Sequence, residues 1–278
     1  MTALLLVLAA LLAARLGLPA LLKTLGLHPD YRGTRYRLPG RRALVVTTSQ
    51  TTLDKPGRPG AGRRTGVFAS EMTMPYYAFL DAGMEVDVAS IAGGEIPVEP
   101  MSLSWLLASP SDRRLRRDPV LLAKVQASLP LAELDLASYD IVFLAGGWGA
   151  AYDFGPSEAL GAGISAAWAA GKVVGGVCHG PLGLLKAVDV QGKPLVRDRR
   201  LTAVTDRQIR QLGIHFTPQH PERELRQAGA LFEAKAARPD MFAQHVVTDG
   251  HLVTGQNQNA GVAVAQAMLK AAGGTPDH

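Results

Sequence analysis

The sequence predicts an α/β protein whose mostly parallel sheet is covered by helices on both faces. Short apolar runs rich in β-branched residues alternate along the chain with stretches of helical character. This alternation is typical of parallel sheets, because parallel strands need a crossover connection, which is usually a helix. The composition agrees: of the 278 residues, 47% are hydrophobic and 19% are charged, which suits a chain with a substantial buried core.

The N-terminus is a hydrophobic segment. Residues 3–22 are apolar except for Arg15, and a helix of that length spans roughly 30 Å, one hydrocarbon core. Arg15 costs about 2.5 to 3.5 kcal/mol on insertion scales, but each leucine returns about 0.3 to 0.6, and the segment has ten. We therefore expect residues 1–25 to form a hydrophobic helix that anchors the protein in a membrane. A cleaved signal peptide and a packed amphipathic helix are the alternatives.

Charge suggests where the globular part lies. The net charge is +5, and much of the basic excess falls between Arg15 and Arg42, after the hydrophobic segment. Positive residues remain on the cytoplasmic side of a membrane, so we expect an anchored protein whose globular part is cytoplasmic, or alternatively a soluble cytoplasmic protein. No recognisable nucleic-acid motif accompanies the basic residues, and we expect no nucleic-acid partner.

We expect one α/β domain over residues 43–272, between a basic linker at 26–42 and a disordered tail at 273–278. The apolar run at 43–48 predicts the first buried strand. Residues 52–65 are rich in proline, glycine and arginine and predict a flexible basic loop. This loop lacks the Gly-Lys-Ser/Thr ending of a phosphate-binding loop.

The remaining elements continue the alternation. A helix at 71–82 ends at Gly83, a typical C-terminal signal, and a strand at 84–89 follows. Further helices are expected at 119–128, 157–170, 222–228 and 260–271, and further strands at 140–145, 172–177 and 201–205. An Asp-Gly turn joins two strands within residues 246–254.

The chain has one cysteine, Cys178, between Gly176 and Gly180, so an intramolecular disulfide is excluded. An apolar strand, Gly-x-Cys-x-Gly and a helix-compatible stretch predict a sharp strand-to-helix turn that presents a nucleophile. Glycines leave room for the close backbone approach, and the cysteine itself would be strained. We expect the thiol to face solvent, with the next helix N-terminus favouring its thiolate. A buried, inert cysteine is the alternative.

Sites in parallel sheets form at the carboxyl ends of the strands. Cys178 and the turn formed by Gly146 and Gly147 both follow predicted strands, so they should meet at that edge. His215, His220 and Glu222 are weaker candidates for a metal site, because no second histidine stands four residues away on a helix. We expect no metal.

Several motifs resemble those of one superfamily. They lie at residues 66–71, 83–90, 145–153, 176–181 and 253–257. Together they resemble the ThiJ/DJ/PfpI superfamily, which is similar to class I glutamine amidotransferases, in the branch that holds glyoxalase III enzymes and stress chaperones. The resemblance runs from about Ala43 to the C-terminal helix and omits the N-terminal segment. It implies a flavodoxin-like three-layer sandwich that is usually a homodimer.

The resemblance also implies a set of site residues. Cys178 would be the nucleophile, Glu71 would hydrogen-bond its sulfur, and His179 would be the general acid and base. A carboxyl group beside a thiolate must itself be protonated, because two adjacent anions are unfavourable in a partly dry site. The alternative for Glu71 is a solvated carboxylate that serves the helix dipole. The backbone amides of Gly147 and His179 are candidate oxyanion donors, and Gly146 and Trp148 would line the pocket.

The implied reaction converts a 2-oxoaldehyde such as methylglyoxal to a 2-hydroxy acid. Cys178 would attack the aldehyde, a proton would move between two carbons, and water would release the product without a metal or organic cofactor. The alternatives are an amide or peptide hydrolase and a non-enzymatic stress chaperone or oxidation sensor. In the sensor, Cys178 would be oxidised to a sulfinic acid.

One position departs from the family pattern. Glyoxalase relatives carry an acidic residue that orients the histidine, and here that position holds Gln208 or Ile209. Asp206 and Glu222 are the candidate substitutes. Without a carboxylate the imidazole tautomer is less controlled, so we expect catalysis that is slower than in relatives that have it, or of another kind.

Overall fold

The protein is built around a seven-stranded sheet, in a computed structural model that describes residues 12, 15 and 17–277. The strand order is β11-β12-β8-β7-β2-β5-β6. The strands are β2 (Arg42–Thr47), β5 (Glu85–Ser90), β6 (Leu129–Pro130), β7 (Ile141–Leu144), β8 (Val173–Val177), β11 (Val246–Asp249) and β12 (Leu252–Gly255). All neighbours are parallel except β11 and β12, which form the hairpin predicted around the Asp-Gly turn. The α/β class with a mostly parallel sheet is confirmed.

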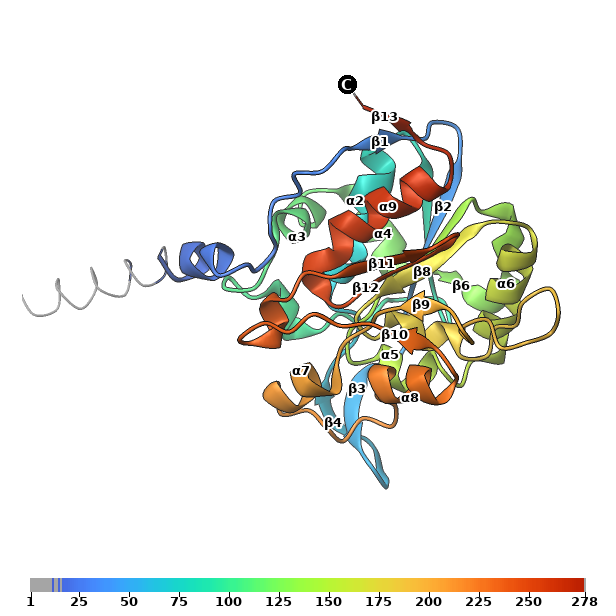
Figure 1. The fold of residues 1–278 in the computed structure, drawn as a ribbon. Helices are drawn as coiled ribbons and strands as arrows, with labels where there is room; N and C mark the ends of the chain where they lie inside the picture. The colour runs from blue at the N-terminus through green and yellow to red at the C-terminus, as the bar shows by residue number, and fades with distance from the viewer. Residues whose placement is uncertain (1–11, 13–14, 16, 278) are drawn as a thin grey trace, which may run out of the picture.

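Helices cover both faces of the sheet (Figure 1). On one face, α2 (Ala69–Asp81) and α9 (Gly261–Ala271) pack on a core that includes Ala43 and Val45 of β2. On the other face, α6 (Glu158–Ala169) packs on a core that includes Leu44 and Val46. Successive residues of β2 therefore face opposite helical layers, as the alternation of side chains in a strand requires. The shorter helices are α3 (Pro110–Leu115), α4 (Pro119–Gln126), α5 (Ala150–Asp153), α7 (Asp206–Gln211) and α8 (Pro221–Gln227).

The predicted loop at residues 52–65 is a β-hairpin, so that expectation is wrong. Strands β3 (Thr52–Lys55) and β4 (Arg58–Arg64) pair antiparallel. The carboxylate of Asp54 accepts hydrogen bonds from the backbone N–H groups of Gly60 and Gly62, at 2.8 and 3.0 Å. A side chain thus satisfies backbone groups across the turn, and the proline, glycine and arginine content conceals this local pairing.

The expected linker and tail contact each other. β1 (Tyr36–Arg37), from the segment 26–42, pairs antiparallel with β13 (Thr275–Pro276), from the segment 273–278. The backbone N–H of Tyr36 also donates to the side chain of Gln266 in α9, at 2.8 Å. The expectation of a structureless linker and a disordered tail therefore misses a small sheet on the outside of α9.

The N-terminal segment is only partly described. Residues 17–24 are helical and extend away from the body of the protein (Figure 1). Among the described residues, no helix is long and apolar enough to cross a membrane. Most of the expected anchor, residues 1–11, 13–14 and 16, lies outside the described residues.

Candidate active site

The turn after β8 has the predicted geometry. Cys178 has φ +59°, in the left-handed region that side chains with a Cβ rarely adopt. A Cβ on Gly176 or Gly180 would lie only 2.2 or 2.1 Å from the carbonyl oxygen of Leu144 in β7. These glycines let the turn lie directly against the neighbouring strand, and the strained cysteine is fixed at the carboxyl edge of the sheet.

The Cys178 thiol is buried, which corrects the expectation of a solvent-facing thiolate. The residue is 7% exposed, and its Sγ lies 3.4 Å from Nδ1 of His179. Burial, and then the adjacent Glu71, raise the pKa of the thiol well above its ordinary value, although the N–H groups of Gly147 and His179 oppose this. The segment after the turn, Gly180–Leu184, is a short 3₁₀ helix rather than an α-helix, so the dipole expected to favour the thiolate is small.

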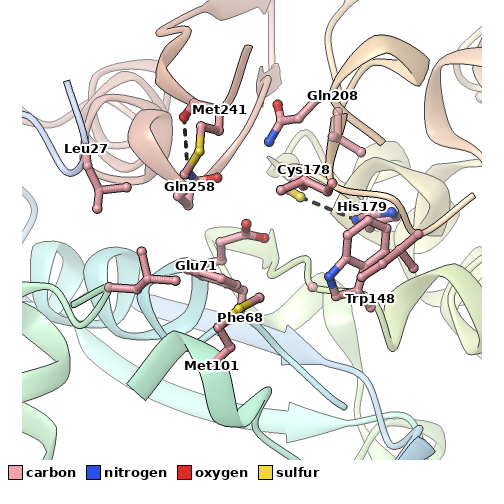
Figure 2. Close-up of a pocket in the computed structure, with 15 residues that line it drawn as sticks. Leu27, Phe68, Glu71, Met101, Trp148, Cys178, His179, Gln208, Met241 and Gln258 are labelled. Carbon is pink, nitrogen blue, oxygen red and sulfur yellow. Dashed lines mark hydrogen bonds between the residues drawn. The ribbon is translucent and has the colours of Figure 1, made fainter. Parts of the chain in front are cut away.

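Glu71 lies in the first turn of α2 and is buried rather than solvated. Figure 2 shows its carboxyl group facing the sulfur of Cys178. Burial raises the pKa of Glu71 to about 8, although contacts with Cys178 and Gly146 act in the opposite direction. A Cβ on Gly146 would approach Oε2 of Glu71 to 2.4 Å, so the glycine makes space for this carboxyl. The raised pKa favours the protonated form of Glu71 near neutral pH, and its burial excludes a solvated helix-start carboxylate.

His179 is held as a neutral imidazole. It is 2% exposed, and burial, followed by the nearby His220, lowers the pKa of its ring to about 3. Its ring packs against Trp148, with centroids 4.9 Å apart and planes tilted by 53°. Within the described residues, its buried Nε2 has no hydrogen-bond partner. The ring is therefore positioned by packing, with one nitrogen near the sulfur and the other unpaired.

Both candidate orienting acids have partners elsewhere. Oδ1 of Asp206 lies 3.3 Å from Nδ1 of His220. Glu222 accepts a hydrogen bond from the backbone N–H of Asp206, at 3.0 Å, and forms an ion pair with Arg226. Asp206 and Glu222 thus belong to the contact between α7 and α8, and neither is among the residues that line the cavity around Cys178.

Gln208 lies at the cavity that contains Cys178 and His179 (Figure 2). It belongs to the first turn of α7, where its backbone N–H donates to the capping hydroxyl of Thr205, at 3.0 Å. Its side-chain oxygen accepts a hydrogen bond from Nδ2 of Asn257, at 3.3 Å. The position expected to hold the family's acid therefore reaches the site, but it carries a neutral amide.

The cavity has an empty volume of about 690 Å³, counting its open mouth. Glu71, Cys178 and His179 lie together at one end of the cavity, which we call the reactive end, and Trp148 and Gly147 line it beside them. Gly146, also expected at the pocket, is not among the lining residues. Most of its other lining is apolar: Leu27, Phe68, Met101, Leu107, Val204, Leu212, Ile214 and Met241. A mostly apolar lining with a few polar groups at one end is typical of a small-molecule site.

Sequence reasoning missed most of the apolar lining. Met101 and Leu107 come from the segment between β5 and α3, Leu212 and Ile214 follow α7, and Leu27 comes from the expected linker. None belongs to a motif or to an element that the sequence predicts, so no pattern in the sequence assigns them to a cavity. As for metals, no group of three or more histidine, cysteine or acidic side chains among the described residues is arranged to hold one.

The chain is similar in sequence and structure to proteins named as glyoxalases. The glutathione-independent glyoxalase hsp3101 of Schizosaccharomyces pombe is 26% identical over 218 residues, which cover 75% of this chain and 88% of that protein. Glyoxalase 3 of Candida albicans is 27% identical over 225 residues, covering 76% and 91% of the two chains. The crystal structure of glyoxalase III from Candida albicans superposes with a TM-score of 0.74 at 25% identity, covering 83% of this chain and 97% of that one.

A broader match gives the family. Residues 64–271, well over half of the chain, match the DJ-1/PfpI family. The match includes the hairpin β3–β4 only at its end and leaves out the N-terminal segment that contains Leu27. It contains Glu71, Cys178 and His179. The chain therefore belongs to the DJ-1/PfpI family.

Proposed function

We propose that this protein is a glutathione-independent glyoxalase, which converts 2-oxoaldehydes to 2-hydroxy acids with Cys178 as the nucleophile. The relatives named as glyoxalases support the reaction class. The observation that carries the proposal is the reactive end of the cavity. There a strained cysteine, a buried carboxyl with a pKa of about 8 and a neutral imidazole meet at one small apolar pocket.

The first step joins the Cys178 sulfur to the aldehyde carbon. As the S–C bond forms, the S–H proton passes to Nδ1 of His179, 3.4 Å from the sulfur, and then to the carbonyl oxygen, which gives a neutral hemithioacetal. The thiol and the imidazole are uncharged before this step, and the hemithioacetal is uncharged after it. Separated charges, which are unfavourable in a buried site, therefore do not persist. The N–H groups of Gly147 and His179 stabilise negative charge as it develops.

The second step moves a proton between two carbons. His179 removes the hydrogen from the hemithioacetal carbon, which gives an enediol, and the proton is delivered to the neighbouring carbon. A thioester of the 2-hydroxy acid then remains on Cys178. Glu71, protonated below about pH 8, exchanges protons with the substrate oxygens. Water cleaves the thioester, releases the 2-hydroxy acid and restores the thiol.

The neutral amide at Gln208 limits the rate of proton transfer by His179. A carboxylate at the free nitrogen of the histidine would fix its tautomer and stabilise its cation. Here Nε2 of His179 has no such partner among the described residues, and burial already opposes its protonation. We therefore assign His179 the role of a weak base, and we expect a slower enzyme than one with a Cys-His-acid arrangement.

The burial of Cys178 argues against the oxidation-sensor alternative. Oxidation of cysteine follows thiolate character and exposure. Cys178 is 7% exposed, and the pKa of its thiol is raised. Nothing in the lining of the cavity specifically favours the amidase or peptidase alternatives.

Product formation without glutathione tests the proposal. The purified protein is incubated with methylglyoxal, and lactate is measured for the wild type, Cys178→Ser and Val190→Ser. Val190 is 73% exposed and remote from the cavity lining, so its variant is the matched control. We expect lactate from the wild type and the control, and none from Cys178→Ser. If the wild type makes no lactate, or Cys178→Ser makes as much, the proposal is wrong.

Membrane attachment through the N-terminal segment is a separate proposal. It is supported by the apolar composition of residues 3–22 and by the exposure of Leu12, Leu18 and Leu21 within the described part of that segment. Fractionation of cells that express the full chain, or the chain without residues 1–25, tests it. We expect the full chain in the membrane pellet and the shortened chain in the supernatant; equal partition of the two would contradict attachment.

A further inference from the structure

The cavity is polar mainly at its reactive end. Glu71, Cys178 and His179 lie at that end, and Gln208 lies beside them. Gln258 also lines the cavity, and its Nε2 donates to the carbonyl oxygen of Met241, at 3.1 Å. Most of the remaining surface is hydrocarbon, thioether or indole. Among the described residues that line it there is no lysine or arginine. We define the apolar wall as Leu27, Met101, Leu107, Leu212, Ile214 and Met241. Contact with this wall does not stabilise a bound substrate through a charged substituent. An apolar substituent makes the binding free energy more favourable in proportion to the apolar surface that it buries.

One residue of this wall comes from outside the family domain. Leu27 lies between the N-terminal helical residues and β1 and precedes the family match at residues 64–271. It is 4% exposed, whereas its neighbour Leu25 is 54% exposed. The chain thus contributes one leucine to the cavity from a segment that otherwise leads away from the domain, and the two leucines form a natural matched pair.

The next residue holds Leu27 in place. The backbone N–H of His28 donates to Oδ1 of Asn259, at 2.9 Å. The ring of His28 donates through Nε2 to the carbonyl oxygen of Leu107, at 2.8 Å. The pKa of His28 is lowered by burial, so the ring is neutral and this nitrogen carries its proton. His28 therefore joins the linker to two segments of the domain, and Leu27 and Leu107 are fixed on the same wall.

We propose that the apolar wall makes this enzyme selective for 2-oxoaldehydes with a bulky apolar substituent, such as an aryl group or a branched alkyl chain, with Leu27 as a specificity-determining residue. The inference rests on the proposed function. Methylglyoxal presents a single methyl group to this wall and leaves most of it uncovered. A larger apolar substituent covers it, and one additional methylene in an apolar pocket gives about 10-fold discrimination or more.

The kinetic test compares phenylglyoxal with methylglyoxal. For the wild type we expect kcat/KM to be at least about 10-fold higher for phenylglyoxal. Leu27→Gln should lower kcat/KM for phenylglyoxal about 10-fold and that for methylglyoxal by a clearly smaller factor, because an uncompensated polar group is placed against the larger substituent. Leu25→Gln should change neither. Higher kcat/KM for methylglyoxal in the wild type, or equal losses for both substrates in Leu27→Gln, would overturn the inference.

A second variant covers the case in which Leu27→Gln does not fold. Met101 also belongs to the apolar wall and is 45% exposed, so Met101→Gln disturbs the core little. We expect it to shift selectivity in the same direction as Leu27→Gln, by a few-fold. If Met101→Gln leaves the ratio of the two kcat/KM values unchanged, the apolar wall does not determine selectivity for the substituent.

A binding measurement separates this inference from the proposed function. The probes are two neutral diols that share a head group, 1-phenyl-1,2-ethanediol and propane-1,2-diol, titrated calorimetrically into the Cys178→Ser protein. We expect the phenyl compound to bind at least about 10-fold more tightly, with the advantage lost in a double variant with Leu27→Gln. If the wild type turns over neither aldehyde but the phenyl diol still binds more tightly, the proposed activity is wrong and the selectivity of the apolar wall is supported. Equal affinities would reject the wall even in an active enzyme.

Discussion

The two ends of the cavity are built by different means. At the reactive end, Cys178 and His179 follow β8, and Glu71 lies in the first turn of α2, so each side chain is held by an element that packs on the central sheet. The apolar wall is assembled instead from the N-terminal segment, the connection before α3, the residues after α7 and the short 3₁₀ helix that contains Met241. The chemistry is thus placed on rigid elements and the selectivity on connecting segments, which is where protein families vary most freely.

The two ends also differ in burial. Glu71, Cys178 and His179 are all less than 10% exposed, whereas the wall ranges from the buried Leu27, 4% exposed, to Met101 and Leu212, which are 45% and 40% exposed. Burial shifts every pKa at the reactive end towards the uncharged form. The wall contributes no such effect, because its residues carry no charge. Changes at the reactive end should therefore act on kcat and on pH dependence, and changes in the wall should act on KM and selectivity.

The largest effect is expected for Glu71→Gln. Glutamine keeps the size of the side chain and a hydrogen-bond donor towards the sulfur, but it cannot release or accept a proton. We expect kcat to fall about 100-fold or more, with the protein still folded by circular dichroism. Above about pH 8, where Glu71 ionises, the reaction rate of Cys178 with iodoacetamide should be higher in the variant, because the Glu71 carboxylate contributes to the raised pKa of the thiol. A variant with wild-type kcat would remove Glu71 from the mechanism.

The second prediction concerns stability against pH. The pKa of Glu71 is raised from 4.5 to about 8 in the folded protein, so the folded state holds a proton that the unfolded state has released. This contribution to stability is fully present below pH 4.5 and is lost as the pH rises towards about 8, by about 1.4 kcal/mol per pH unit, a 10-fold change in the unfolding constant per unit.

Glu71→Gln removes that contribution to the pH dependence. Chemical denaturation of the wild type and the variant between pH 5 and about pH 8 measures it. We expect the wild type to lose stability relative to the variant as the pH rises. Asp153, whose pKa burial raises to about 6, is present in both proteins and cancels in the comparison. Parallel stability curves would show that Glu71 is ionised in the folded protein.

The reactive end of the cavity could be predicted from the sequence to a greater extent than the apolar wall. The glycines around Cys178, the acid at Glu71 and the following His179 form a local pattern whose geometric reason is visible in the sequence itself, and the turn and the apposition of these groups were predicted. The state of the thiol was not, because its pKa depends on how deeply neighbouring segments bury it. That quantity is set by tertiary packing, which no local pattern encodes.

The wall and the outer elements escaped prediction for a related reason. Leu27 belongs to a segment without periodicity, and it becomes a cavity residue only because His28 bonds to Asn259 and Leu107, each distant in the chain. The hairpin β3–β4 was hidden by glycines and prolines that usually indicate loops. β1 and β13 are two residues each, too short to produce an alternating pattern.

A smaller gain is expected for Gln208→Glu. The Gln208 side chain lies at the cavity beside Cys178 and His179, and position 208 is one of the two at which the resemblance predicts an acid. A carboxylate there should raise the pKa of His179 and stabilise its cation, so we expect kcat to rise by roughly 10-fold. Gln211→Glu is the control, because Gln211 is on the same helix but its side chain accepts from the backbone N–H of Asp240. If Gln208→Glu does not exceed the control, the missing acid is not what limits the rate.

The smallest effect is expected in the wall, for Leu212→Gln. Leu212 caps the end of α7 and is 40% exposed, so a polar side chain there can remain hydrated and disturbs only part of the substituent's contact. We expect KM for phenylglyoxal to rise about 2- to 3-fold with kcat unchanged, measured by initial rates beside Glu71→Gln. The opposite pattern, a loss in kcat at constant KM, would show that the wall positions the reacting atoms. The assignment of kcat effects to the reactive end and KM effects to the apolar wall would then be wrong.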